Sequence, residues 1–88
     1  MKADKTKVCR LLKTARGQID GILKMIGDDK YCLDISCQVM AAQAILKKTN
    51  EEILRAHLKS CVNDAFSDGN RDDAQQKIEE LTKIIGKL

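Results

Sequence analysis

The sequence predicts an all-α protein that forms one domain over residues 1–88. The chain contains no proline, and its apolar residues recur at steps of three and four, the period of a helix with one buried face. Polar breaks occur at two places, GDDK at 27–30 and SDGNRDD at 67–73. A chain of this length buries only roughly 60% of its unfolded surface, which is too little for two cores. We therefore expect three consecutive helices.

The first helix precedes the break at 27–30, and its apolar residues fall on a single stripe. These residues are Val8, Leu12, Ala15, Ile19, Ile22, Leu23 and Ile26. A stripe of this kind predicts one face packed against a neighbouring helix.

The second helix is predicted over 31–66, because no breaker interrupts this segment. At 1.5 Å per residue it extends roughly 50 Å, so the first helix can cover only part of it. Tyr31 and Phe66 are the only aromatic residues, which leaves a thin core for a solitary chain. We therefore expect the rest of this helix to pair with another protomer.

The third helix is predicted over 72–88. Its first turn is acidic, which favours a helix N-terminus. Its apolar side contains Ile78, Leu81, Ile84, Ile85 and Leu88.

The N-terminal residues lack the apolar core of a signal peptide, and no run approaches the 18 apolar residues of a membrane span. We therefore expect a cytoplasmic protein that does not contact membranes. In that reducing compartment the four cysteines favour metal or thiol chemistry over disulfides. No phosphate-binding loop, nucleophile elbow or carboxylate pair points to an enzyme.

His57 and Cys61 form an H-x-x-x-C pair on one face of the second helix. The next candidate ligand, Cys32, precedes His57 by 25 residues, or about 37 Å along a straight helix. If two copies of this helix pack antiparallel about an axis near residues 45 and 46, Cys32 of one chain meets His57 and Cys61 of the other. Two thiolates and an imidazole suit Cu(I), or Zn(II) and Ni(II) with a fourth ligand, at one ion per protomer.

Simpler interpretations of these residues remain open. Cysteine is often an ordinary buried residue, and a single histidine usually has no metal to bind. Cys37 follows Cys32 by five residues, too far around the helix to chelate with it, so packing is favoured for Cys37. Cys9 is either a small apolar residue or an extra ligand or reactive thiol.

Residues 1–16 contain one acidic and six basic residues, a local charge of +5. The basic residues are Lys2, Lys5, Lys7, Arg10, Lys13 and Arg16. A cationic helix that oligomerisation multiplies could bind nucleic-acid phosphates, and Lys47 with Lys48 would extend its surface. An ordinary solvated face would have a similar composition.

The runs RGQIDGILKMIGDDKYCLDIS, QVMAAQAILKK and AHLKSCV resemble the family of copper-sensing operon repressors, whose relatives sense nickel, cobalt, formaldehyde or persulfides. The resemblance covers residues 8–88. It implies a dimer built on an antiparallel four-helix bundle, two of which pair into a tetramer. It also implies repression of transcription that is relieved when the inducer binds, here with genes for copper export or buffering as targets.

The resemblance implies the same metal ligands, Cys32 from one subunit with His57 and Cys61 from its partner. It also assigns Tyr31 and Glu80 to hydrogen bonds that orient the ligating histidine. Such outer interactions can connect ligation to a helix shift.

For DNA binding the resemblance points to Lys13, Arg16 and Lys48. Relatives often have an arginine where this chain has Leu11. Either Arg10 or the lysine-rich arm that includes Lys7 would then supply the missing contact.

Three other functions remain open. A persulfide-sensing repressor would link Cys32 and Cys61 without metal, although that branch of the family lacks the histidine. A nickel or cobalt sensor would need further ligands, such as Cys9 or the N-terminal amine. A copper chaperone or storage protein could use the same ligands but would have no need of the basic first helix.

Overall fold

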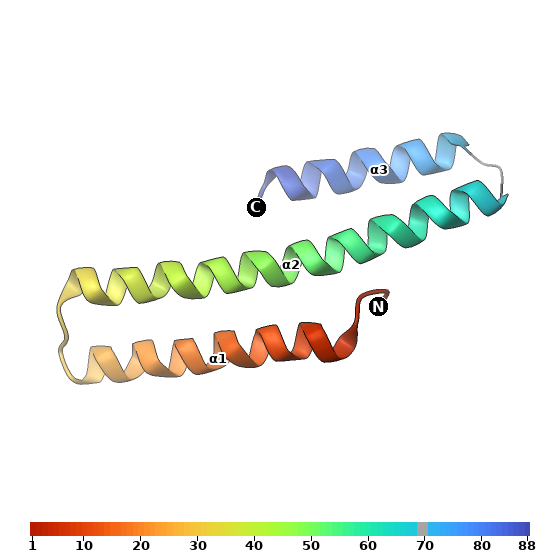
Figure 1. The fold of residues 1–88 in the computed structure, drawn as a ribbon. Helices are drawn as coiled ribbons and strands as arrows, with labels where there is room; N and C mark the ends of the chain where they lie inside the picture. The colour runs from red at the N-terminus through yellow and green to blue at the C-terminus, as the bar shows by residue number, and fades with distance from the viewer. Residues whose placement is uncertain (69–70) are drawn as a thin grey trace.

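The computed structural model describes residues 1–68 and 71–88, with the side chains of 65–68, 71, 73 and 74 left aside. This part of the chain forms three helices and no strand: α1 (Lys5–Gly27), α2 (Cys32–Asp68) and α3 (Arg71–Gly86). α1 lies along the N-terminal part of α2, and α3 lies along its C-terminal part on the opposite side (Figure 1). The predicted all-α, three-helix protomer is confirmed.

The second predicted break is longer than the one in the structure. The second helix was expected to end at residue 66 and the third to begin at residue 72, but α2 continues to Asp68 and α3 begins at Arg71. Only 69 and 70 lie outside the described residues. Ser and Asp lower helix propensity only modestly, Arg is a good helix former, and no proline removes a backbone donor here, so the helices extend into the polar segment.

Hydrogen bonds at both ends define α1. The Asp4 carboxylate accepts bonds from the backbone N–H groups of Thr6, at 2.9 Å, and Lys7, at 3.4 Å. At the other end, Lys30 N–H donates to the Met25 carbonyl at 3.0 Å. This Schellman closure requires a left-handed residue, and Asp29 with φ 55° takes that role.

Replacing Asp29 by glycine is therefore expected to stabilise the protein. A left-handed conformation costs an L-residue about 1–2 kcal/mol, less for Asp, whereas glycine adopts it freely. The greater freedom of glycine in the unfolded chain offsets about 0.4–1 kcal/mol of this gain. We expect Asp29→Gly to raise the melting temperature by about 2–6 °C, and the neighbouring Asp28→Gly, where φ is −87°, to lower it.

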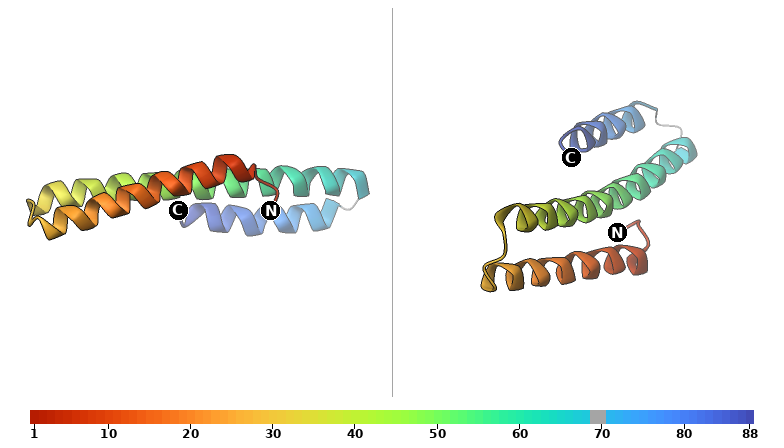
Figure 2. Two further views of the ribbon diagram at one scale, coloured as in Figure 1. Left: turned by 90° about the horizontal axis from the view of Figure 1, so that it is seen from below. Right: turned by 60° about the vertical axis from the view of Figure 1, so that its left-hand side comes forward.

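The three helices form a single layer (Figure 2). The Cα extents are 59 × 25 × 11 Å and the radius of gyration is 17.7 Å, against about 12 Å for a compact chain of this length. The buried apolar residues are few and mostly small: Ala3, Val8, Ala15, Ala42, Cys61 and Leu81. No side chain among those described is fully buried. The layer therefore has almost no interior of its own.

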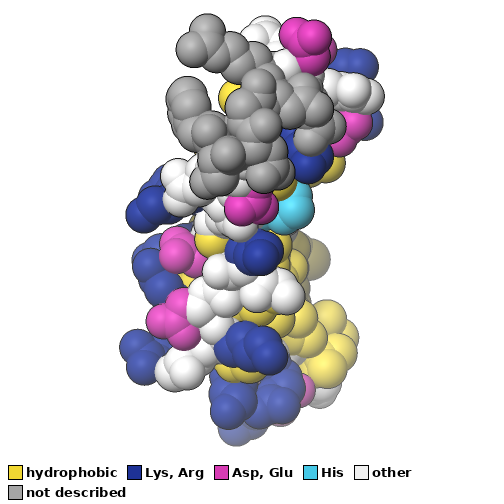
Figure 3. All heavy atoms as spheres, turned by 90° about the vertical axis from the view of Figure 1, so that its right-hand side faces the viewer, with side chains coloured by type: hydrophobic (Ala, Val, Ile, Leu, Met, Phe, Trp, Pro, Cys, Tyr) yellow, Lys and Arg dark blue, Asp and Glu magenta, His cyan; other side chains and the backbone are white. Residues whose placement is uncertain are grey.

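Large apolar side chains remain open to solvent on α1 beside the face that packs on α2. On this exposed stripe Leu12, Ile19, Leu23 and Ile26 are 44%, 45%, 61% and 56% exposed. Figure 3 shows hydrophobic atoms at the surface next to the lysines and arginines on the α1 side of the molecule. The expected pairing with a second copy stays a prediction, and this stripe supports it.

Candidate metal centre and nucleic-acid interface

α2 brings His57 and Cys61 together. Their side chains lie one helical turn apart, with 3.4 Å between the His57 Nε2 and Cys61 Sγ atoms. Cys61 is 9% exposed, whereas His57 lies at the surface. An imidazole nitrogen and a thiol sulfur at this separation form a bidentate donor set suited to a soft or borderline metal ion. The two side chains are thus as close as the spacing predicts, and their role as metal ligands stays a prediction.

The third predicted ligand lies at the other end of the same helix. Cys32 is the first residue of α2 and is exposed. Because α2 is one helix from Cys32 to Asp68, the 25-residue separation from His57 keeps the two side chains far apart. Among the described residues of one chain, no three His, Cys, Asp or Glu side chains gather where they could hold a metal. The complete ligand set stays a prediction that requires a second chain.

The two residues assigned to orient the histidine, Tyr31 and Glu80, are both exposed. Tyr31 precedes α2 and is 64% exposed. Glu80 lies on the exposed side of α3, in a shallow groove beside Glu79 and Lys83. Neither residue makes a hydrogen bond with His57 within the described part of this chain, so both assignments remain predictions.

The remaining thiols are exposed. Cys9 and Cys37 are both free and open to solvent in the protomer. The packing favoured for Cys37 is therefore not provided by the helices of its own chain. Cys9 lies on the outer side of α1, among basic residues.

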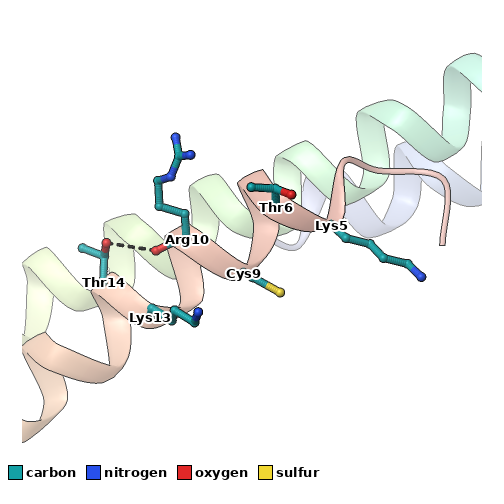
Figure 4. A pocket seen from close by; sticks show the side chains of 6 residues that line it. All are labelled: Lys5, Thr6, Cys9, Arg10, Lys13 and Thr14. Carbon is teal, nitrogen blue, oxygen red and sulfur yellow. Dashed lines mark hydrogen bonds between the residues drawn. The ribbon is translucent and has the colours of Figure 1, made fainter.

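The basic residues at the start of α1 surround a shallow hollow of about 530 Å³. Its lining residues are Lys5, Thr6, Cys9, Arg10, Lys13 and Thr14. Figure 4 shows these side chains on one side of α1 with α2 behind it, and the Thr14 hydroxyl donating to the Arg10 carbonyl at 3.0 Å. Within the described part of the chain Lys5, Arg10 and Lys13 form no ion pair, so their charges are available to anions.

Lys7 differs from these residues because it has a partner. Its Nζ atom lies 3.3 Å from Oε2 of Glu52 on α2, and the two side chains are 51% and 26% exposed. Lys7 is one of the DNA-binding residues predicted from the sequence, whereas its partner Glu52 is not among the predicted residues. The helical hairpin could have revealed it, because Lys7 lies twenty residues before the end of α1 and Glu52 twenty residues after the start of α2.

The other predicted DNA-binding residues, Arg16 and Lys48, are exposed on α1 and α2. Leu11 is partly buried, whereas the adjacent Arg10 is exposed. Arg10 is thus the neighbouring cation that remains free to contact an anion.

Residues 4–87 of this chain match the sequence pattern of the metal-sensitive transcriptional repressor family. The chain belongs to that family. The repressor is 40% identical over 83 residues to the copper-sensing transcriptional repressor CsoR of Mycobacterium tuberculosis, covering 94% of this chain and 67% of that one. It is 37% identical over 85 residues to CsoR of Bacillus subtilis, covering 97% and 81%.

Solved structures agree with this family assignment. The copper-sensing repressor CsoR with Cu(I) from Geobacillus thermodenitrificans superposes with a TM-score of 0.76 at 31% identity, covering 99% of this repressor and 91% of that chain. The nickel-responsive regulator InrS gives a TM-score of 0.81 over 99% and 94% at 24% identity, a likeness of fold alone. The predicted family and the predicted regulatory, non-enzymatic role are confirmed. No helix in the described part of the repressor combines the length and apolar character that a bilayer crossing needs.

Proposed function

We propose that this repressor is a cytoplasmic copper sensor whose metal-free form binds operator DNA and whose Cu(I) form releases it. The observation that carries the proposal is the 3.4 Å contact between His57 Nε2 and Cys61 Sγ on one face of α2. Together with Cys32 it supplies two thiolates and one imidazole, a donor set that favours Cu(I) over harder ions. The relatives named as copper-sensing repressors support the same metal.

The complete site forms between two subunits. Antiparallel pairing of two α2 helices about their middle brings Cys32 of each chain to the His57 and Cys61 pair of the other. Two-fold symmetry then gives two identical sites per dimer and one Cu(I) per protomer. The exposed apolar stripe on α1 supports this dimer, and two such dimers form the tetramer.

Operator DNA binds to the basic surface of the metal-free protein. Lys5, Arg10 and Lys13 line one open hollow on each protomer, so assembly places several such groups along the phosphates of a duplex. Arg16 and Lys48 extend the surface onto the adjoining parts of α1 and α2.

Release follows from linkage between the two sites. If Cu(I) ligation weakens DNA binding, DNA must weaken Cu(I) binding by the same coupling free energy, typically 1–3 kcal/mol. The His57 imidazole, oriented by Tyr31 and Glu80, is the group through which ligation acts on the helices.

The test compares the wild-type protein with His57→Ala, using anaerobic Cu(I) and a duplex that the metal-free protein selects from a random-sequence pool. The wild-type protein should bind one Cu(I) per protomer in competition with a chromophoric chelator, bind Ni(II) and Zn(II) more weakly, and dissociate from the duplex. His57→Ala should retain Cu(I) through its two thiolates and stay on the DNA. Cu(I)-induced dissociation of this variant would contradict the switch role of His57.

Loss of Cu(I) from the wild-type protein to the chelator would contradict copper sensing itself. The three exposed free thiols would then favour the second candidate, a persulfide-sensing repressor. Treatment with polysulfide and mass mapping would locate a link between Cys32 and Cys61 in that case.

A further inference from the structure

The N-terminal basic segment contains one cation that the protein itself neutralises. Lys7 forms an ion pair with Glu52 at 3.3 Å, whereas Lys5, Arg10 and Lys13 have no ionic partner within the described residues. The pair connects α1 to α2, and the Glu52 side chain is only 26% exposed. The charge of a partly buried carboxylate is screened less by salt than that of a fully exposed one.

A phosphate that approaches Lys7 would meet this carboxylate as well. An ammonium group has three N–H donors and could contact both anions, but the two negative charges would then lie within a few ångströms of each other. DNA binding must therefore break the ion pair or accept the repulsion. In either case Glu52 opposes the contact that Lys7 would otherwise make.

We propose that Glu52 is an intramolecular competitor of DNA phosphates for Lys7 and sets the operator affinity of the metal-free repressor below the value that its basic surface alone would give. This inference rests on the proposed function, because it concerns the same DNA-binding surface. Glu52 would then modulate DNA affinity without contacting DNA. Its charge is negative, whereas residues of a DNA interface are expected to be positive.

The test is a double-mutant cycle of Lys7→Gln, Glu52→Gln and the double variant, with Glu51→Gln as the matched control. Glu51 is the preceding residue on α2 and carries the same charge, so its replacement changes the net charge equally. The readout is the affinity of the metal-free protein for the selected duplex at several salt concentrations.

Glu52→Gln is expected to bind the duplex about two- to fivefold more tightly than the Glu51→Gln control, the range of an exposed to partly exposed ion pair. The slope of log affinity against log salt should steepen by about one for each Lys7 released to a phosphate. Lys7→Gln should weaken binding more in the Glu52→Gln background than in the wild-type protein.

Three results would overturn the inference. Equal gains in DNA affinity for Glu52→Gln and Glu51→Gln would show that the effect comes from net charge alone. A gain that persists in the Lys7→Gln background would show that Lys7 is not the target. Weaker DNA binding by Glu52→Gln, accompanied by a lower melting temperature, would make the ion pair a structural link between the helices.

Failure of this inference can be told apart from failure of the proposed function. If the wild-type protein binds the duplex and releases it with Cu(I) while the cycle shows no coupling, only the inference is wrong. If the metal-free protein selects no duplex at all, both are wrong.

Discussion

Cys32→Ala and Cys61→Ala proteins, each prepared alone, are expected to lose Cu(I) to a chelator that the wild-type protein resists. Each variant lacks one of the three proposed ligands in every site. Loss of a residue that only orients a ligand typically lowers metal affinity about 10–100-fold, and loss of a ligand itself should exceed that range.

A mixture of the two variants, unfolded and refolded together, is expected to recover part of the Cu(I) binding. In a mixed dimer, Cys32 from the Cys61→Ala chain meets the intact His57 and Cys61 of the Cys32→Ala chain. One of its two sites is then complete, so random pairing restores about a quarter of the wild-type sites.

Two controls make this result specific. Cys37→Ala removes an exposed thiol that is not a proposed ligand and should bind Cu(I) like the wild-type protein. A refolded mixture of Cys32→Ala with a chain that carries both Cys32→Ala and Cys61→Ala should show no recovery, because no dimer then contains Cys32 and hence none has a complete ligand set. Failure of the Cys32→Ala and Cys61→Ala mixture to recover, with its dimers intact, would contradict an intersubunit site.

Reversing the charges of Arg10 and Lys13 to glutamate is expected to lower operator affinity at least about a hundredfold. Both residues line the open hollow on α1, and oligomerisation repeats the change along the duplex, where each lost phosphate contact also lowers the salt dependence. DNA binding measured across salt concentrations checks both effects, and Cu(I) affinity should stay unchanged.

The matched control for this variant is the double charge reversal of Lys30 and Lys87. Both lysines are exposed and distant in sequence from the hollow, and the net charge changes by the same amount. This control should lose much less affinity. Equal losses in the two double variants would show that binding follows total charge and that the α1 surface is not the DNA interface.

Local sequence patterns were enough to predict most of the fold. The three helices follow from the apolar period and the absence of proline, and the turn at 27–30 follows from its polar residues. The identity of the left-handed residue did not follow, because Gly27 is the usual choice and yet Asp29 occupies that conformation. The length of the second break was overestimated, because polar residues can belong to helix ends as well as to loops.

Only part of the candidate site could be predicted from the sequence. His57 and Cys61 could be predicted because a separation of four residues fixes their proximity within any helix. The proposed contribution of Cys32 requires a second chain, so the protomer alone does not bring Cys32 to the pair. Glu52 was missed because its partner lies on another helix, and a period within one helix carries no information about the charges that it faces.

The single-layer shape of the protomer has a consequence for how the repressor persists in a cell. A layer with almost no interior gains most of its stability when another copy covers its apolar stripe, so folding and assembly should behave as one concentration-dependent equilibrium. The unfolding midpoint is then expected to rise as the protein is concentrated. Chains made in small numbers would remain open to proteolysis until they find a partner, so the cell's synthesis rate would set a threshold below which little repressor accumulates.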